Sequence, residues 1–424
     1  MTERTEPTAE YRCPGEEYPI SQAVHLGRLA RFYPGCRQCL HRDDTGTLSA
    51  RQVKRLLETR ARGLPRPLFH DEGAGGVYLN DLTPGIAREM AAALGVALQR
   101  RGALQDASRH GTPVIVIAGD GRPLSCELVA AVGEGLRWAG CRVVDIGPAT
   151  AACLTFAIGH LAGGGGILVG NPDEKPQMVG LKFWAGGPRP LSAGGALDTL
   201  EEVYGSGVDR PTRRYGPLRR FQAEVPYLAS LAGYYHALRP LRFVLDTSCG
   251  TLVRYLQKLT EPVACRIIEC QSALAPDRPS ERIVAESAHF GVAVGDDGET
   301  CRLFDEQGRR VPAEQLLVLI AGHVLSERPQ RTVVLEAETA AEVAEAIRAA
   351  GGRVALSGAR RAEMAAAMRT HGGLLGGGQS GRLWYDCGGL PLPDALRTLT
   401  LLLVLLSQSD RPLSEVLDRR VGLG

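Results

Sequence analysis

Between residues 111 and 207 the chain alternates short apolar runs with longer segments in which apolar residues recur every three or four positions. The runs PVIVIAG (113–119), CRVVDIG (141–147) and GGILVG (165–170) have the length and composition of buried strands. The segment LSCELVAAVGEGLRWAG (124–140) between the first two has helical spacing. Strands separated by such helices predict a parallel or mixed sheet with helices on its faces.

The same alternation returns twice later in the chain. LRFVLD (241–246) and CRIIECQ (265–271) predict two strands around one helix, and RTVVLEAE (331–338) and RVALSGA (353–359) predict another pair. We therefore expect an α/β protein with three tandem α/β/α domains and mixed sheets. The boundaries that we predict for these domains are 61–210, 211–310 and 311–424. The basic run RRYGPLRR (213–220) is typical of a solvated linker.

Length and composition fit a soluble multidomain protein. A chain of 424 residues is too long for one core, and its 44% apolar and 23% charged content is ordinary. The net charge of +2 favours neither a nucleic-acid nor a membrane partner. The N-terminus has no signal-peptide pattern, and the most apolar run (396–408) is shorter than the ~20 residues that span a bilayer. We expect a cytoplasmic protein, with a protein partner or a homo-oligomer left open.

Residues 1–60 form a separate Cys-rich module. Cys13, His25, Cys36 and Cys39 follow the pattern C-x11-H-x10-C-x2-C, with His41 as an alternative to His25. The C-x2-C spacing is typical of a zinc site, which would stabilise a segment too poor in apolar residues to fold alone. An iron–sulfur cluster, a redox dithiol and free thiols are the alternatives.

Five segments of the chain resemble, in order, the motifs of the α-D-phosphohexomutases, the phosphoglucomutase/phosphomannomutase family. These segments are HDEGAGGVYLNDLTP (70–84), AGDGRPLSCEL (118–128), GGGILVGNPDEKPQMVGLKFW (164–184), FGVAVGDDGETCRLFDEQGR (290–309) and LLGGGQSGR (374–382). The resemblance implies three phosphohexomutase domains after the Cys-rich module. It also implies catalysis by a phosphoserine, a divalent cation held by three acidic side chains, and a sugar-binding loop.

The phosphoserine loop (169–182) departs from that pattern. The phosphoserine position falls at Pro172, and Asp173 and Glu174 follow it. No Ser, Thr, Cys or His lies between Val169 and Gly180. Proline cannot carry a phosphoryl group, and the two carboxylates would repel a sugar phosphate.

The metal loop (294–300) is also altered. The family's three acidic positions align with Gly295, Asp297 and Glu299, with Asp296 beside them. These carboxylates predict at most a weak Mg²⁺ site, and the alternative is an acidic turn in solvent.

The sugar loop (376–382) has Gly378 at the family's Glu position and Arg382 at its His position, whereas Gln379 and Ser380 persist. The candidate ligand-binding residues are those that match or stand at family positions, namely Arg122, Lys182, Gln379, Ser380 and Arg382. For Arg122 the alternative is a turn pair with Asp120.

The family also has a fourth, phosphate-binding domain, which we do not find before residue 424. The altered motifs favour a family member of carbohydrate metabolism without mutase activity, with sugar-phosphate binding or a scaffold role. The alternatives are an active phosphohexose mutase with a non-standard site, and an iron–sulfur or redox protein on the same fold.

Overall fold

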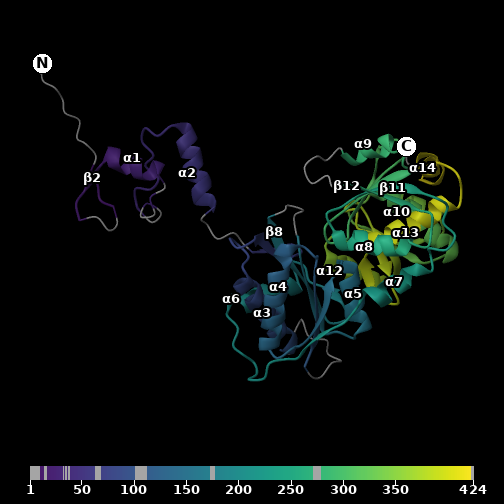
Figure 1. Ribbon diagram of the computed structural model, residues 1–424, viewed down its shortest axis with the longest axis horizontal. Helices are drawn as coiled ribbons and strands as arrows, with labels where there is room; N and C mark the ends of the chain where they lie inside the picture. Colours follow the sequence, from purple (N-terminus) through teal and green to yellow (C-terminus); the bar gives the residue numbers. More distant parts are fainter. Residues whose placement is uncertain are drawn as a thin grey trace, which may run out of the picture. The chain divides into compact units, whose positions relative to one another are not determined.

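The computed structural model describes residues 10–13, 17–31, 33, 36, 39–62, 68–100, 112–171, 177–270 and 278–421. The chain divides into two compact units, Met1–Pro67 (unit 1) and Leu68–Gly424 (unit 2), drawn in Figure 1. None of the described helices is long and apolar enough to cross a membrane.

Unit 1 is a small module with little apolar interior. Its described elements are β1 (Glu10–Tyr11), β2 (Ile20–Ser21), α1 (Gln22–Ala30) and α2 (Ala50–Arg62). The two strands pair antiparallel. Within the described residues, the buried apolar cluster of this unit consists of Leu29, Cys36 and Leu56.

The first sheet of unit 2 has the strand order β10-β6-β5-β7-β8-β4-β3, with β9 against β8. Its parallel part is β5 (Val114–Gly119), β6 (Arg142–Pro148), β7 (Gly165–Gly170) and β10 (Leu218–Arg220). Its antiparallel part is β3 (Phe69–His70), β4 (Gly73–Val77), β8 (Met178–Ala185) and β9 (Arg189–Pro190). The helices of this part are α3 (Pro84–Gln99), α4 (Pro123–Trp138), α5 (Ala151–His160) and α6 (Ala196–Gly205).

The second and third sheets share one topology, β12-β11-β13-β14-β15 and β17-β16-β18-β19-β20. In each, three parallel strands are followed by two antiparallel ones. The second part contains α7 (Glu224–Ala232), β11 (Arg242–Asp246), α8 (Gly250–Thr260), β12 (Arg266–Cys270), α9 (Arg278–Ala285), β13 (Phe290–Val294), β14 (Cys301–Phe304) and β15 (Arg310–Val311). The third contains α10 (Ala313–Glu327), β16 (Thr332–Glu336), α11 (Ala341–Ala349), β17 (Arg353–Ser357), α12 (Arg361–His371), β18 (Gly373–Gly377), β19 (Trp384–Asp386), β20 (Pro391–Pro393), α13 (Ala395–Ser407) and α14 (Leu413–Val421).

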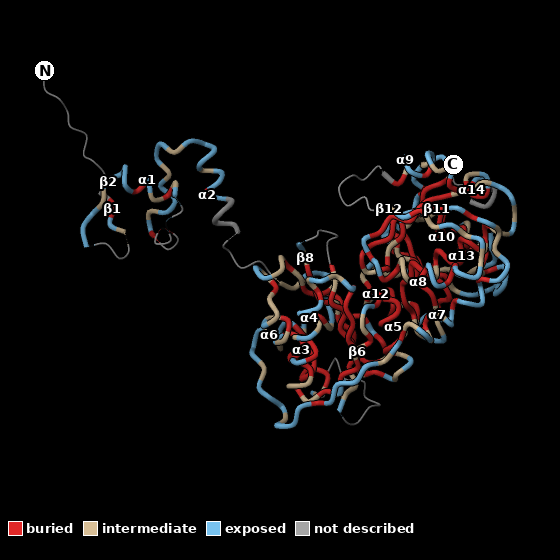
Figure 2. Tube along the Cα trace, viewed as in Figure 1, coloured by how far each residue is buried: buried red, intermediate tan, exposed pale blue. Residues whose placement is uncertain are grey.

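Figure 2 shows where the buried residues of unit 2 lie, and the two-residue period of the strands divides them between the two faces of each sheet. On β5, Ile115 and Ile117 pack in a cluster with residues of α3 and α4, whereas Val116 and Ala118 face a second cluster. That second cluster runs on through α5, the other two sheets and the apolar helix α13. One continuous core thus joins the three sheets, and the predicted α/β class with mixed sheets is confirmed.

One segment differs from its expected structure. Leu218–Arg220, in the run interpreted as a linker, form β10 and pair with β6 in the first sheet. This sheet therefore extends past the boundary predicted at residue 210. All three residues are exposed, so the strand has no apolar periodicity by which the sequence would reveal it.

Candidate functional site

The ends of several strands bring six charged side chains together in unit 2. We call this set the central charge cluster, and its members are Glu72, Lys182, Asp297, Glu299, Arg361 and Arg382. Lys182 lies on β8, and the two acidic residues at 297 and 299 follow β13. Arg361 begins α12, and Arg382 follows β18. The cluster therefore joins side chains from all three sheets of unit 2.

Lys182 connects the first sheet to the acidic loop. Its Nζ donates hydrogen bonds to Asp297 and, over 3.1 Å, to Oε2 of Glu299. The Lys182 side chain is only 13% exposed and the Glu299 side chain is fully buried. An ammonium that has lost most of its water is stabilised here by two carboxylates.

Glu299 also meets two arginines. Arg361 Nε lies 3.0 Å from its Oε1, and Arg382 Nε lies 3.6 Å from its Oε2. Arg361 is 1% exposed, and its guanidinium stacks over the Trp184 ring with 4.4 Å to the ring centroid. Three cations thus surround one buried carboxylate.

The charges in the cluster shift the pKa values of two of its members, Asp297 and Arg382. Burial raises the pKa of Asp297, but the charge of Lys182 and its hydrogen bond outweigh burial and lower the pKa to about 2. Burial lowers the pKa of Arg382, whereas Glu299 and Glu72 raise it, and the net shift is upward. Asp297 and Arg382 are therefore both charged at neutral pH.

The carboxylates of the predicted Mg²⁺ site are all engaged with protein donors. Asp296 accepts hydrogen bonds from Asn171 Nδ2 (2.6 Å) and from the Ser248 hydroxyl. Asp297 and Glu299 accept from Lys182. In the described part of the chain, no group of three or more His, Cys, Asp or Glu side chains is placed to hold a metal ion. These residues do not fit a divalent cation unless Lys182 is displaced.

Arg122 forms the turn pair that was one of its two predicted roles. Its Nε donates to Asp120 Oδ2 over 2.6 Å, and its Nη2 donates to the Met178 carbonyl over 3.1 Å. The Arg122 side chain is one-fifth exposed. Its charge is therefore already balanced by a buried carboxylate.

The sugar loop is held by a carboxylate that the sequence did not reveal. Glu336, at the end of β16, accepts hydrogen bonds from the Ser380 backbone N–H (3.0 Å) and hydroxyl. Gln379 Nε2 donates to the Glu338 carbonyl over 2.9 Å. A Cβ at Gly378 would lie 2.7 Å from the Glu336 Cβ, so no larger residue fits there as long as Glu336 stays in place.

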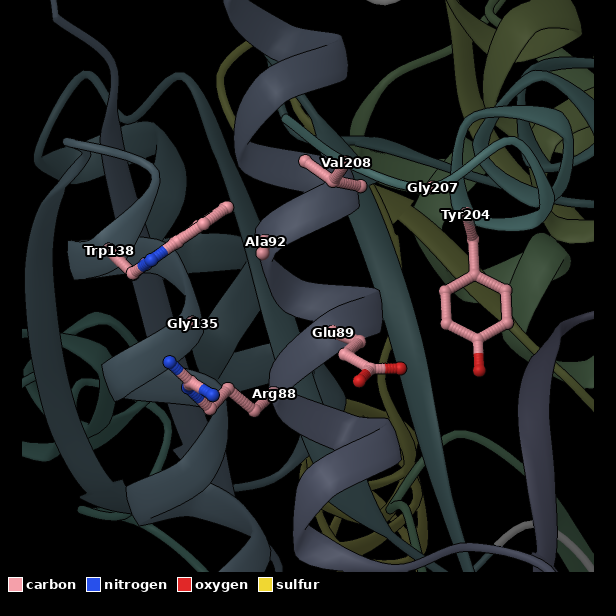
Figure 3. A pocket seen from close by; sticks show the side chains of 8 residues that line it. All are labelled: Arg88, Glu89, Ala92, Gly135, Trp138, Tyr204, Gly207 and Val208. Carbon is pink, nitrogen blue, oxygen red and sulfur yellow. The ribbon is translucent and has the colours of Figure 1, made fainter. Parts of the chain in front are cut away.

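The cavity beside Lys182 is small. It is lined by His70, Asn171, Lys182, Asp296, Asp297 and other residues, and its volume of about 20 Å³ has room for about one water molecule. A cavity of about 400 Å³ lies instead between α3 and α4, where Figure 3 shows Arg88 and Trp138 in its wall. None of the central charge cluster lines that larger cavity.

In unit 1 the structure places two of the predicted metal ligands side by side. The sulfur atoms of Cys13 and Cys39 are 3.8 Å apart. His25 is buried, and its ring stacks on Tyr11 with 4.1 Å between centroids. His41 meets the same tyrosine edge-on at 5.2 Å.

Comparisons with known proteins agree with the fold of unit 2. The family description "Phosphoglucomutase/phosphomannomutase, alpha/beta/alpha domain I" matches residues 66–200. A phosphoglucomutase of Neisseria gonorrhoeae is 24% identical over 327 residues, which are 74% of this chain and 70% of the relative. Residues 66–200 thus match the first domain of the α-D-phosphohexomutases, and the chain as a whole is similar to members of that family.

Two solved structures show how far the phosphohexomutase fold extends. A phosphoglucomutase/phosphomannomutase family protein of Burkholderia thailandensis has a TM-score of 0.72 at 23% identity, covering 83% of this chain and 79% of that one. An Aspergillus fumigatus N-acetylphosphoglucosamine mutase in complex with GlcNAc-6P and magnesium has a TM-score of 0.52 at 10% identity, covering 88% and 83%. The resemblance therefore extends over the three sheets of unit 2.

Three residues of the site were not among the predicted site residues. Glu72, Arg361 and Glu336 each contact a predicted residue from a distant part of the chain. Glu72 lies within the motif segment 70–84, whereas Arg361 and Glu336 lie outside all five segments. Arg361 left one signal in the sequence, because an arginine in the first turn of a helix opposes the helix dipole and needs an acidic partner. Pro172, Asp173 and Glu174 lie outside the described residues.

Proposed function

We propose that this phosphohexomutase-family chain binds a phosphorylated sugar and does not transfer its phosphoryl group. The named relatives, and the neighbour whose structure contains GlcNAc-6P and magnesium, support a sugar-phosphate ligand. The composition of one loop and the position of Lys182 support the absence of transfer.

The first argument concerns the loop after β7. Transfer through a phosphoenzyme requires a nucleophilic side chain, which in the family is a serine hydroxyl. Residues 170–180 read GNPDEKPQMVG and contain no hydroxyl, thiol or imidazole. Pro172 stands at the phosphoserine position, so that step has no equivalent group.

The second argument, which carries the proposal, is the ion pairing of Lys182. Enzymatic phosphoryl transfer depends on cations that offset the charge of the phosphoryl oxygens. The carboxylates that would hold a divalent cation bind the Lys182 ammonium instead. Lys182 Nζ donates one hydrogen bond to Asp297 and another, over 3.1 Å, to Glu299. A metal ion would have to break both interactions before it could bind.

The groups left for a ligand lie on the sugar loop. Gln379 and Ser380 are exposed, and the Arg382 side chain is 18% exposed. Arg382 Nη1 lies 3.7 Å from Glu72 and its Nε lies 3.6 Å from Glu299, both beyond the ~3.2 Å limit of a good hydrogen bond. This loosely held guanidinium is the group that we assign to the phosphate.

Thermal unfolding with added ligand tests the binding half of the proposal. Glucose 1-phosphate, mannose 1-phosphate or GlcNAc-6P should stabilise the full chain, by about 2.7 kcal/mol at a ligand concentration of 100 times Kd. Arg382→Gln should abolish the shift, whereas Arg310→Gln, at the exposed position of β15, should preserve it. No shift with any of these ligands would refute the binding role.

A turnover assay tests the second half. The same protein with Mg²⁺, a hexose bisphosphate and each monophosphate should give no isomer above the rate without protein. Turnover that the Arg382→Gln variant loses would overturn the proposal and favour an active mutase with a non-standard site.

A further inference from the structure

Unit 1 has a cluster of sulfur and nitrogen donors that the sugar-phosphate proposal does not use. Cys39 Sγ lies 3.8 Å from Cys13 Sγ. Two sulfurs bound to one tetrahedral zinc ion at about 2.3 Å each lie about 3.8 Å apart, whereas a disulfide would require about 2.05 Å. The pair thus already has the separation that a shared zinc ion imposes.

Cys36 is the third thiol of the predicted ligand set. It is buried beside Leu29 and Leu56, three residues before Cys39. The Cys39 backbone N–H donates to the Cys36 carbonyl over 3.4 Å, so one turn carries both cysteines. In the described residues no three donors are yet close enough to hold a metal.

His25 has the arrangement of a zinc-binding histidine. Its Nε2 is 2.8 Å from the backbone carbonyl of Asp44, and because a carbonyl only accepts, Nε2 must carry the hydrogen. Its Nδ1 is buried and has no hydrogen-bond partner among the residues that the structure describes, and the residue is 1% exposed. Metal-binding histidines commonly donate their second N–H to a carbonyl in this way, which leaves the other nitrogen for the metal.

Tyr11 brings this histidine near the thiols. Its ring stacks on His25, and it precedes Cys13 by two residues. His41, the alternative ligand, is only partly buried and lies edge-on to the same ring. The buried nitrogen without a partner therefore favours His25.

We propose that unit 1 binds one zinc ion through Cys13, Cys36, Cys39 and His25. Binding releases the protons of the three thiols, and His25 binds as the neutral imidazole. The ion draws Cys36 onto the Cys13–Cys39 pair and completes a site that is only partly formed without it. A module of this size with so small an apolar cluster needs such a cross-link, because domains below about 70–80 residues seldom gain enough stability from their core.

The proposal goes beyond the sugar-phosphate site and is independent of it. The cluster lies within unit 1, whereas the central charge cluster lies within unit 2. Loss of the metal should therefore leave sugar-phosphate binding measurable, so that the two proposals can fail separately.

Metal analysis of the purified full chain is the direct test. We expect about one zinc per chain and no absorption in the visible range. Cys39→Ser and His25→Gln should lose the zinc, whereas Cys126→Ser, at an exposed cysteine of α4, should retain it. A brown, iron-containing protein, or a wild type without stoichiometric metal, would overturn the proposal.

Cobalt titration keeps the test decisive if a variant folds poorly. Full-length protein stripped with a chelator should bind one Co²⁺ and develop thiolate-to-cobalt charge transfer and tetrahedral d–d bands. The His41→Gln protein should give the same spectrum. A spectrum lost in His41→Gln and kept in His25→Gln would refute the assignment of the fourth ligand. A Cys13–Cys39 disulfide, seen by mass spectrometry of protein purified without reductant, would refute the zinc site.

Discussion

Replacing Lys182 with methionine removes the ammonium that bridges Asp297 and Glu299. Methionine retains most of the apolar volume of the side chain, so the variant tests charge rather than packing. Arg361 and Arg382 still neutralise Glu299, but Asp297 loses the cation that lowers its pKa to about 2. We expect the free energy of unfolding to fall by about 3 kcal/mol at neutral pH, the lower end of the range for breaking a buried ion pair.

Most of that loss should depend on pH. The pKa of Asp297 falls from 3.8 in the unfolded chain to about 2 in the folded protein, which at about 1.36 kcal/mol per pKa unit is worth about 2.4 kcal/mol. A pKa lowered by folding gives stability that is complete above the unfolded value and is lost as the pH falls toward the folded value. Near pH 3 about half of the contribution has gone, so wild type and variant should converge in acid.

Urea unfolding of the two proteins between pH 7 and pH 3 measures this convergence. Lys258→Met is the matched control, because Lys258 pairs with Glu224 while its side chain is 55% exposed. Such a surface pair contributes about 0–1 kcal/mol. A constant difference between wild type and Lys182→Met across this pH range would refute the role given to Asp297.

The same variant tests whether Lys182 excludes a metal. With Lys182 gone, Mg²⁺ should stabilise the variant, by about 2.7 kcal/mol at 100 times Kd, and should leave the wild type unchanged. Equal stabilisation of both proteins by Mg²⁺ would show that the ammonium and the metal do not compete.

Two further predictions concern the packing of unit 2. Gly135→Ala should destabilise the protein by about 1–3 kcal/mol in urea unfolding, because the new Cβ would lie 2.1 Å from the Arg88 carbonyl oxygen. Gly322→Ala, in α10 with nothing within 4 Å of the new Cβ, should stabilise the protein by about 0.5–1 kcal/mol. A change of the same sign in the free energy of unfolding of both glycine variants would contradict this reasoning. Tyr227→Phe should lower the free energy of unfolding by about 1.5–3 kcal/mol, because the buried Tyr227 hydroxyl donates a hydrogen bond to Asp394 over 3.0 Å. An unchanged urea midpoint would show that this hydrogen bond does not stabilise the fold.

The sequence predicted the elements whose periodicity is local. Each buried strand, such as β5 or β16, is an apolar run whose length and neighbours identify it without knowledge of the partner strands. The exposed strand β10 carries no such pattern and was interpreted as part of a linker. Its existence depends on pairing with β6, about 75 residues earlier in the sequence, and no local pattern encodes that pairing.

The candidate site shows the same limit at the level of single charges. Motif positions identified Lys182, Asp297 and Arg382 one by one. They did not indicate that Lys182 neutralises the acidic loop. That contact spans 115 residues and depends on how the first two sheets meet. Neighbouring segments of the sequence therefore predicted which residues would be near the site, and only the tertiary arrangement shows which charges cancel.

The sugar loop shows why a substitution in a motif is not simply a loss. Alignment to the family places Gly378 where a glutamate is expected, which indicates a missing carboxylate. In the structure a carboxylate comes instead from Glu336 on the neighbouring strand. A side chain at position 378 would collide with it, since a Cβ there would lie 2.6 Å from Thr339 Oγ1 and 2.7 Å from the Glu336 Cβ. Because Glu336 is buried and accepts both hydrogen bonds of Ser380, it anchors the loop instead of facing a ligand. Glu336 therefore supports the shape of the loop, and the ligand contacts that we propose fall to Gln379 and Arg382.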